Sequence, residues 1–135
     1  MEESLLSRSL CAYLPDRVFD GRRVLPDHAV LVEDQHVQCV LPARELTPDT
    51  PIAAYPGCTI IPGLIDAHVH FMRWQGPLYL AHGVTTVRDT GNPLNWILAR
   101  RSEWEKREWP RIFCTGPLID GPSPVHPVTS RPCTN

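Results

Sequence analysis

The sequence predicts an α/β protein in which a small β-module precedes a parallel sheet with crossover helices. Three observations lead to this fold class. Short β-branched segments with tight turns between them occupy the first part of the chain, and from Thr59 onward strand and helix segments alternate. The third observation is the segment 62–70, Pro-Gly-Leu-Ile-Asp-Ala-His-Val-His, which begins with a turn and ends an apolar strand in two histidines.

The composition indicates a globular chain with an ordinary core. It has 135 residues, of which 42% are hydrophobic and 21% charged, and its formal net charge of -2 gives no basic surface for nucleic acid or for an anionic membrane. The acidic start at Glu2 and Glu3 does not resemble a secretory signal, and the apolar runs are too short for a membrane span. Five cysteines without a Cys-x-x-Cys pair are predicted to be free thiols, so we expect a cytoplasmic protein.

Residues 1–58 are predicted to form the β-module. A hairpin turns at Asp20-Gly21, where glycine accepts positive φ without a steric penalty. Two β-branched segments, 29–32 and 37–40, are predicted as a second pair of strands with a tight turn between them. Residues 41–57 hold four prolines and are predicted to be a loop.

Residues 59–119 are predicted to form a strand–helix–strand–helix–strand unit with a parallel sheet. The predicted strands are 64–70, 85–89 and 111–114. Residues 120–135 are rich in proline and are expected to be a loop or a disordered tail.

Two helices connect these strands. The first is predicted over 78–82, where Gly83 is placed to end it. The second is predicted to begin with Asn92 as its N-cap and Pro93 at its first position. Its apolar stripe is predicted to consist of four residues, Leu94, Ile97, Leu98 and Trp104.

The two histidines are the strongest candidates for a functional site. A strand repeats every two residues, so His68 and His70 are predicted to project from one face, about 6–7 Å apart along the backbone. Asp66 is predicted to lie on that same face. Two neutral imidazoles with a carboxylate behind them suit a zinc-type divalent ion. The alternative is a structural or accidental His-x-His pair.

Two carboxylates are candidates for supporting such a site. Asp66 is interpreted as a residue that orients a ligand or stabilises the turn, not as a ligand itself. Asp89 ends a predicted strand at the edge where parallel β/α sheets bind their ligands, but an ion pair with Arg88 or a neighbouring arginine explains it equally well. No catalytic residue is assigned.

Several motifs together resemble the amidohydrolase superfamily of metal-dependent hydrolases. They are the segment 62–70, the segment 83–89 (Gly-Val-Thr-Thr-Val-Arg-Asp), and the stretches 18–21 and 31–34 in the β-module. The form of 83–89 is similar to the branch that contains imidazolonepropionases and prolidases. The resemblance covers roughly residues 17–119.

The resemblance implies a (β/α)8 TIM barrel, of which this chain holds the first strands, preceded by a small composite β-sandwich module. A full barrel takes roughly 250 residues, so the barrel is expected to be incomplete and the chain to be an N-terminal portion. By position, His68 and His70 correspond to the first two metal ligands. The implied cofactor is one or two divalent ions, with Zn²⁺ favoured.

The implied activity is hydrolysis of a C–N bond in a small amide, cyclic amide or dipeptide by metal-activated water. Two imidazoles are fewer than the three protein ligands of a catalytic zinc, so the isolated chain is expected to bind metal weakly and to be inactive. Two alternatives stay open. In the first, the chain is a non-catalytic truncated protein that binds metal or a relative, or associates with itself, through an open sheet edge. In the second, it is an unrelated α/β module with a structural His-x-His.

Overall fold

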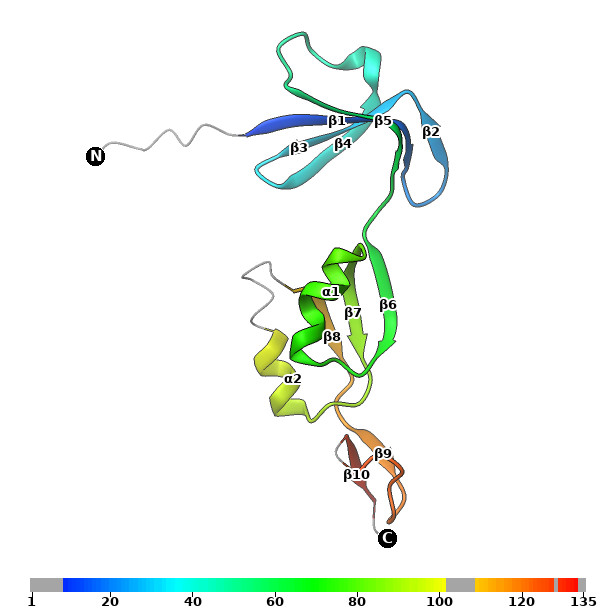
Figure 1. Cartoon of the computed structure of the whole chain (residues 1–135), viewed down its shortest axis with the longest axis vertical. Coiled ribbons are helices and arrows are strands. Elements are labelled where there is room, and N and C mark those ends of the chain that lie inside the picture. The colour runs from blue at the N-terminus through cyan, green and yellow to red at the C-terminus, as the bar shows by residue number, and fades with distance from the viewer. Residues whose placement is uncertain (1–8, 102–108, 128, 134–135) are drawn as a thin grey trace, which may run out of the picture. The chain divides into compact units, whose positions relative to one another are not determined.

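A computed structural model describes residues 9–101, 109–127 and 129–133 of the chain. The chain forms two compact units, Met1–Pro62 and Gly63–Asn135 (Figure 1). The division falls at Pro62, slightly later than the predicted boundary at residue 58. Each unit has its own sheet, and each is described separately below.

The first unit is a five-stranded sheet. Its strands are β1 (Leu10–Phe19), β2 (Val24–Pro26), β3 (His28–Glu33), β4 (His36–Pro42) and β5 (Ile52–Ile60), and a short 3-10 helix covers Ala43–Glu45. The order β2-β1-β3-β4 is antiparallel throughout, while β5 runs parallel to β1. The predicted β-module is therefore confirmed in its strands 29–32 and 37–40 and in the turn at Gly21, which has φ 94°.

Two strands of this sheet are absent from the sequence prediction. β1 begins well before the predicted hairpin, and β5 begins at Ile52, inside the predicted loop 41–57. The prolines of that segment misled the prediction, because Pro56 lies where the pairing of β5 with β1 is interrupted between Tyr55 and Thr59. Proline has no N–H to donate between strands, so it is tolerated where the pairing is interrupted. The next residue, Gly57, has φ 77°.

The turn between β3 and β4 holds two non-glycine residues in the left-handed region, Asp34 at φ 47° and Gln35 at φ 70°. Glycine is preferred there, because a Cβ atom costs about 1 kcal/mol in this region. We expect Gln35→Gly to raise the free energy of unfolding by about 0.5–1 kcal/mol in urea denaturation followed by circular dichroism. Gln38→Gly inside β4 is the control and should lower it. An unchanged or lower value for Gln35→Gly would contradict the assigned strain.

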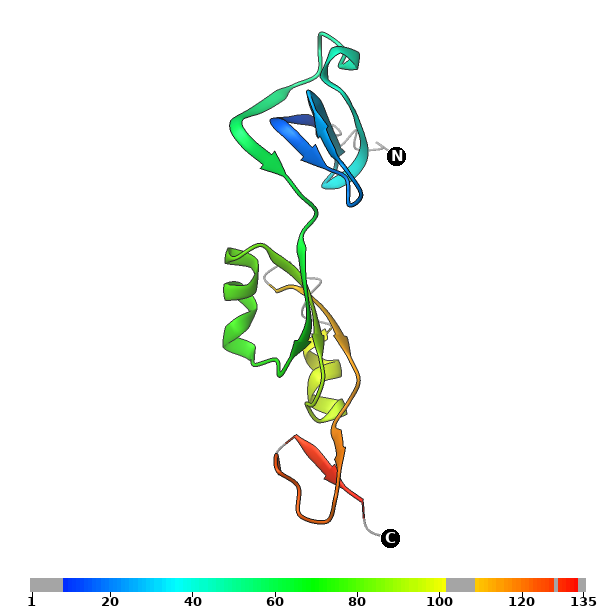
Figure 2. The same cartoon turned by 90° about the vertical axis from the view of Figure 1, so that its right-hand side faces the viewer.

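The second unit contains the predicted alternation of strands and helices. Its parallel sheet has the order β6-β7-β8 (Figures 1 and 2), and the predicted unit 59–119 is confirmed in its sequence of elements. The elements are β6 (Leu64–Val69), a 3-10 helix (Arg73–Gln75), α1 (Gly76–Ala81), β7 (Val84–Asp89), α2 (Leu94–Arg101) and β8 (Arg111–Cys114).

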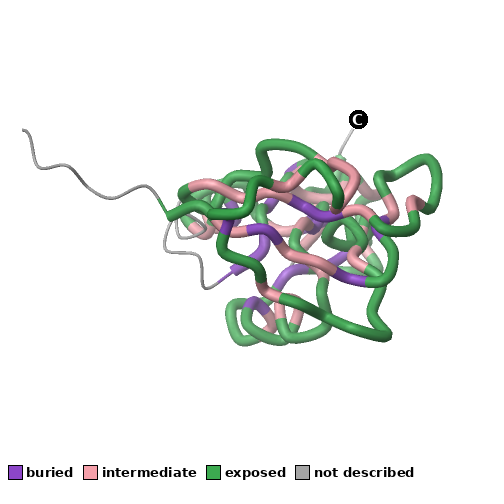
Figure 3. The backbone as a smooth tube through the Cα atoms, turned by 90° about the horizontal axis from the view of Figure 1, so that it is seen from above, coloured by how far each residue is buried: buried purple, intermediate pink, exposed green. Residues whose placement is uncertain are grey.

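One face of this sheet carries the core. The buried cluster consists of Val69, Phe71, Val87, Ile97, Trp109 and Ile112, and Tyr79 of α1 packs against it. Figure 3 draws the buried residues of the chain in purple, and this cluster is part of them. The opposite face is open, since Ile65 is 70% and Phe113 is 52% exposed. The helices therefore cover one side of the sheet, and the other side presents its side chains outward.

Helix α2 differs from its prediction at its start. The carbonyl of Pro93 accepts the first helical hydrogen bond, from Ile97 N at 3.1 Å, while the Asn92 side chain is used elsewhere. Of the predicted stripe, Ile97 is buried, but Leu94 and Leu98 are 48% and 42% exposed. The fourth member, Trp104, lies outside the described residues. Helix α1 ends as predicted, with Gly83 at φ 77°.

The C-terminal segment, expected as a loop or a disordered tail, contains two short strands. β9 (Leu118–Asp120) and β10 (Ser130–Pro132) pair in parallel. A loop whose residues include His126 connects them. Among the described helices, none has the length and apolar character that crossing a membrane requires.

Candidate metal centre

The predicted histidines lie where the three parallel strands end. His70 directly follows β6, Asp89 is the last residue of β7, and Cys114 is the last residue of β8. The pairing places Val69, Asp89 and Cys114 side by side. The carboxyl ends of parallel strands meet at one edge, which is the usual location of ligand sites in β/α folds.

The two imidazoles are adjacent and exposed on the open face of the sheet. Their ring centroids are 5.5 Å apart and their planes are nearly perpendicular, at 89°. Val69 and Phe71 belong to the buried cluster. Because side chains alternate along an extended chain, His68 and His70 lie on the face opposite to that cluster. The predicted pairing of the two side chains on one face is thus observed.

The separation of the rings fits a shared ion. An imidazole bound to zinc places its ring centroid about 3.2 Å from the ion, since the bond is about 2.1 Å and the ring adds about 1.1 Å. Two such rings at a tetrahedral angle have centroids about 5.2 Å apart, close to the 5.5 Å of His68 and His70. Within the described part of the chain, no cluster of three or more His, Cys, Asp or Glu side chains suited to a metal is found.

Asp66 does not share the face of the histidines, so this part of the prediction is wrong. Asp66 pairs with Val87, and Val69 pairs with Asp89, so β6 has one extra residue between these two pairs. Such a bulge breaks the two-residue period on which the prediction rested. Asp66 therefore lies on the same face as buried Val87, and its Oδ1 accepts a hydrogen bond from the backbone N–H of His68 at 3.2 Å. This bond holds the backbone of the bulge from which His68 projects.

The phenol of Tyr79 is close to both carboxylates on the helix-covered face. Burial raises the pKa of Tyr79 above its ordinary value, and the negative charges of Asp66 and Asp89 raise it further. A neutral phenol is therefore favoured there. The effect agrees with the assignment of Asp66 to the face that α1 covers.

Asp89 is fully buried and anchors the backbone around the site. Its Oδ1 accepts from Phe71 N at 2.8 Å and from Asn92 Nδ2 at 2.6 Å, and its Oδ2 accepts from Asn92 N at 3.0 Å and Gly91 N at 3.4 Å. Arg88 alternates to the exposed, opposite face, where it pairs with Phe113. Asp89 therefore joins the ends of β6 and β7, and its support of a metal site stays a prediction.

Two residues near the histidines were not identified from sequence. The Asn92 side chain donates to Phe71 O at 2.9 Å, so it connects the turn after β7 with the segment after β6. His126 has its ring centroid 6.3 Å from that of His70. Two rings on one zinc ion reach about 6.4 Å only in a linear arrangement, so His126 is a neighbour of the pair and not a third ligand in this geometry. No sequence signal indicated either contact.

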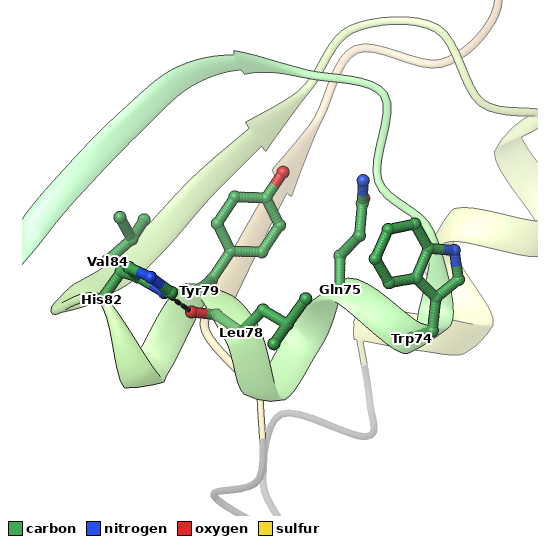
Figure 4. A pocket seen from close by; sticks show the side chains of 6 residues that line it. All are labelled: Trp74, Gln75, Leu78, Tyr79, His82 and Val84. Carbon is green, nitrogen blue, oxygen red and sulfur yellow. Dashed lines mark hydrogen bonds between the residues drawn. The ribbon is translucent and has the colours of Figure 1, made fainter.

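A separate pocket of about 360 Å³ lies along α1 (Figure 4). Its lining residues are Trp74, Gln75, Leu78, Tyr79, His82 and Val84. His82 Nδ1 is 2.8 Å from the carbonyl oxygen of Leu78, a contact at the end of α1 (Figure 4). Trp74 is 65% exposed. Neither His68 nor His70 lines this pocket.

No family model matches the sequence. Solved structures do match. A molinate hydrolase superposes with a TM-score of 0.68 at 25% identity, covering 83% of this chain and 31% of its own. An amidohydrolase gives 0.71 at 20% identity, with 94% and 41% covered. A prolidase complexed with N-methylphosphonate-L-proline gives 0.69 at 19% identity, with 94% and 41% covered. The chain thus spans between 31% and 41% of the length of these hydrolases.

Proposed function

We propose that this chain belongs to the amidohydrolase superfamily and contributes His68 and His70 to a divalent-metal site that hydrolyses C–N bonds. The observation that carries the proposal is the pair of perpendicular imidazoles, 5.5 Å apart, at the carboxyl edge of a parallel sheet. The three strands β6, β7 and β8 would then be the first strands of a (β/α)8 barrel, and unit Met1–Pro62 would be part of the accompanying β-sandwich.

The solved hydrolases support the substrate class. The molinate hydrolase and the prolidase act on small molecules, and both superpose on the two units described above. We therefore propose an amide, a cyclic amide or a dipeptide as substrate, with Zn²⁺ as the favoured ion. Specificity in barrels of this kind comes from the βα-loops, so the choice among these substrates depends on loops after other strands.

The residues of this chain have distinct parts in such a site. His68 and His70 would hold the ion, which when bound supplies an activated water and polarises the substrate carbonyl. Asp66 fixes the backbone N–H of His68, and Asp89 fixes that of Phe71, directly after His70. Two imidazoles are fewer than the three protein ligands of a catalytic zinc. We therefore expect these residues alone to bind zinc weakly and not to turn over substrate.

Calorimetric titration with Zn²⁺ tests this site. The exposed thiols of Cys39, Cys58 and Cys133 are alkylated first, because thiolates also bind zinc. The unmodified histidines should give a weak binding event, and His68→Ala/His70→Ala should weaken it at least about tenfold.

A double variant in the other unit controls for the loss of two imidazoles. His36 is exposed and His28 is half-buried in the other unit, where each Nδ1 lies beside a backbone carbonyl. His28→Ala/His36→Ala should leave the titration unchanged. Equal zinc affinity in the wild type and in the His68→Ala/His70→Ala variant would refute the proposed site.

A further inference from the structure

We propose that Gly91, in the turn between β7 and α2, is a positioning residue that fixes the imidazole of His70 and leaves Nε2 as its metal-binding nitrogen. This inference rests on the proposed function, because it concerns the geometry of the same site. It is carried by the close approach of the turn to the ring and by the hydrogen bonds that hold the turn in place.

The backbone of Gly91 lies against the Nδ1 edge of the His70 ring. A Cβ atom at position 91 would be 2.8 Å from Nδ1 and 3.0 Å from Cε1 of His70, and 3.3 Å from Cγ of Leu118. The first of these distances is shorter than real Cβ contacts allow. The φ angle of Gly91 is outside the left-handed region, so a larger residue here is opposed by the His70 ring, which would have to move, and not by backbone conformation.

The turn is not free to move away from the ring. Asp89 Oδ2 accepts hydrogen bonds from the backbone N–H of Gly91 at 3.4 Å and of Asn92 at 3.0 Å. Asp89 Oδ1 accepts from the backbone N–H of Phe71, the residue after His70, at 2.8 Å. One buried carboxylate therefore fixes both the chain that carries the imidazole and the backbone that limits its rotation.

Two more hydrogen bonds connect the turn after β7 with the chain on either side of His70. The backbone N–H of Thr90 donates to Val69 O at 2.9 Å, and the Asn92 side chain donates to Phe71 O at 2.9 Å. His70 thus lies between Val69 and Phe71, whose carbonyl oxygens both accept hydrogen bonds from the turn after β7. In the observed orientation the Nδ1 edge of the ring lies against this turn, so Nε2 is the nitrogen farther from Gly91 and the one available to an ion shared with His68.

The experiment combines zinc titration with nitrogen-15 NMR of the histidine rings in the whole chain. In the wild type, zinc should shift the Nε2 resonance of His70 and leave Nδ1 protonated. Gly91→Ala should weaken zinc binding at least about tenfold and reduce the Nε2 shift, because the added methyl group displaces the ring. Gly121→Ala is the matched control: it also lies outside the left-handed region and meets no atom within 4 Å, so its affinity should equal that of the wild type.

The outcomes separate this inference from the proposed function. Zinc bound through Nδ1 of His70 in the wild type overturns the inference, and this measurement does not depend on the folding of any variant. Equal affinity and equal Nε2 shifts in the wild type and Gly91→Ala also overturn it, while the metal site itself survives. A wild type that binds no zinc overturns the proposed function, and this inference with it.

Discussion

Replacing Asp89 with alanine is expected to lower the free energy of unfolding of unit Gly63–Asn135 by about 3–5 kcal/mol. The carboxylate is fully buried and accepts hydrogen bonds from four N–H groups, which belong to Phe71, Gly91 and Asn92. Each donor left unpaired in the interior costs about 1–3 kcal/mol, less where water enters. Urea denaturation, with hydrogen exchange of the Phe71 amide as a local probe, measures the effect.

Two further variants make this prediction specific. Asp89→Asn keeps the size of the side chain but replaces one acceptor oxygen by a donor, so it should cost about 1–3 kcal/mol. Arg88→Ala, at the exposed neighbouring position of the same strand, should change stability by less than about 0.5 kcal/mol. If Asp89→Ala costs no more than Arg88→Ala, the anchoring role of the carboxylate is wrong.

Local patterns in the sequence were enough to find the elements that carry the candidate site. The apolar run before His68, the glycine that ends α1 and the strand over 85–89 are each encoded within a few residues, so β6, α1 and β7 lie close to their predicted positions. The histidine pair followed from the same local reasoning, since only two residues of extended chain determine that His68 and His70 are neighbours.

Pairing between distant segments explains what the sequence did not show. The bulge that moves Asp66 to the other face arises from the register of β6 against β7, which no local pattern encodes. β5 was missed for the same reason, because its partner β1 lies about 40 residues earlier and its prolines suggested a loop. Where pairing with a neighbouring strand introduces a bulge, the two-residue alternation is broken. The sequence of that strand alone then does not tell on which face of the sheet each side chain lies.

The prediction of Asn92 as the N-cap of α2 was wrong because its side chain forms hydrogen bonds with other groups. Asn92 has the chemistry of an N-cap, but its amide donates to Phe71 O and to Asp89 instead. The partner, Asp89, is buried only because three strand ends meet there. The approach of His126 to His70 likewise depends on the path of the chain after β8. These contacts are properties of the assembled sheet edge.

Gly76→Ala is expected to destabilise the second unit by about 2–3 kcal/mol, although alanine favours helices by about 1 kcal/mol over glycine. The reason is the contact between the start of α1 and the core. A Cβ atom at Gly76 would lie 2.6 Å from Cδ1 and 2.7 Å from Cγ of Trp109, and that indole is 7% exposed and packs on Phe71 with ring centroids 5.4 Å apart. Overpacking against a ring fixed on both sides outweighs the gain in helix propensity.

A double-mutant cycle with Trp109 decides whether this contact is the cause. Trp109→Leu alone should cost about 2–4 kcal/mol through lost burial, but in its presence Gly76→Ala should become much less destabilising, with a coupling energy above about 1.5 kcal/mol. Asn95→Ala, on the exposed side of α2, reports the propensity gain without a contact and should stabilise slightly. Additive costs for Gly76→Ala and Trp109→Leu would show that the two residues do not meet, and the packing of α1 on the core would have to be revised. A stabilising Gly76→Ala in the wild-type background would lead to the same conclusion, since the contact with Trp109 and the restriction that Pro77 places on the residue before it both oppose alanine there.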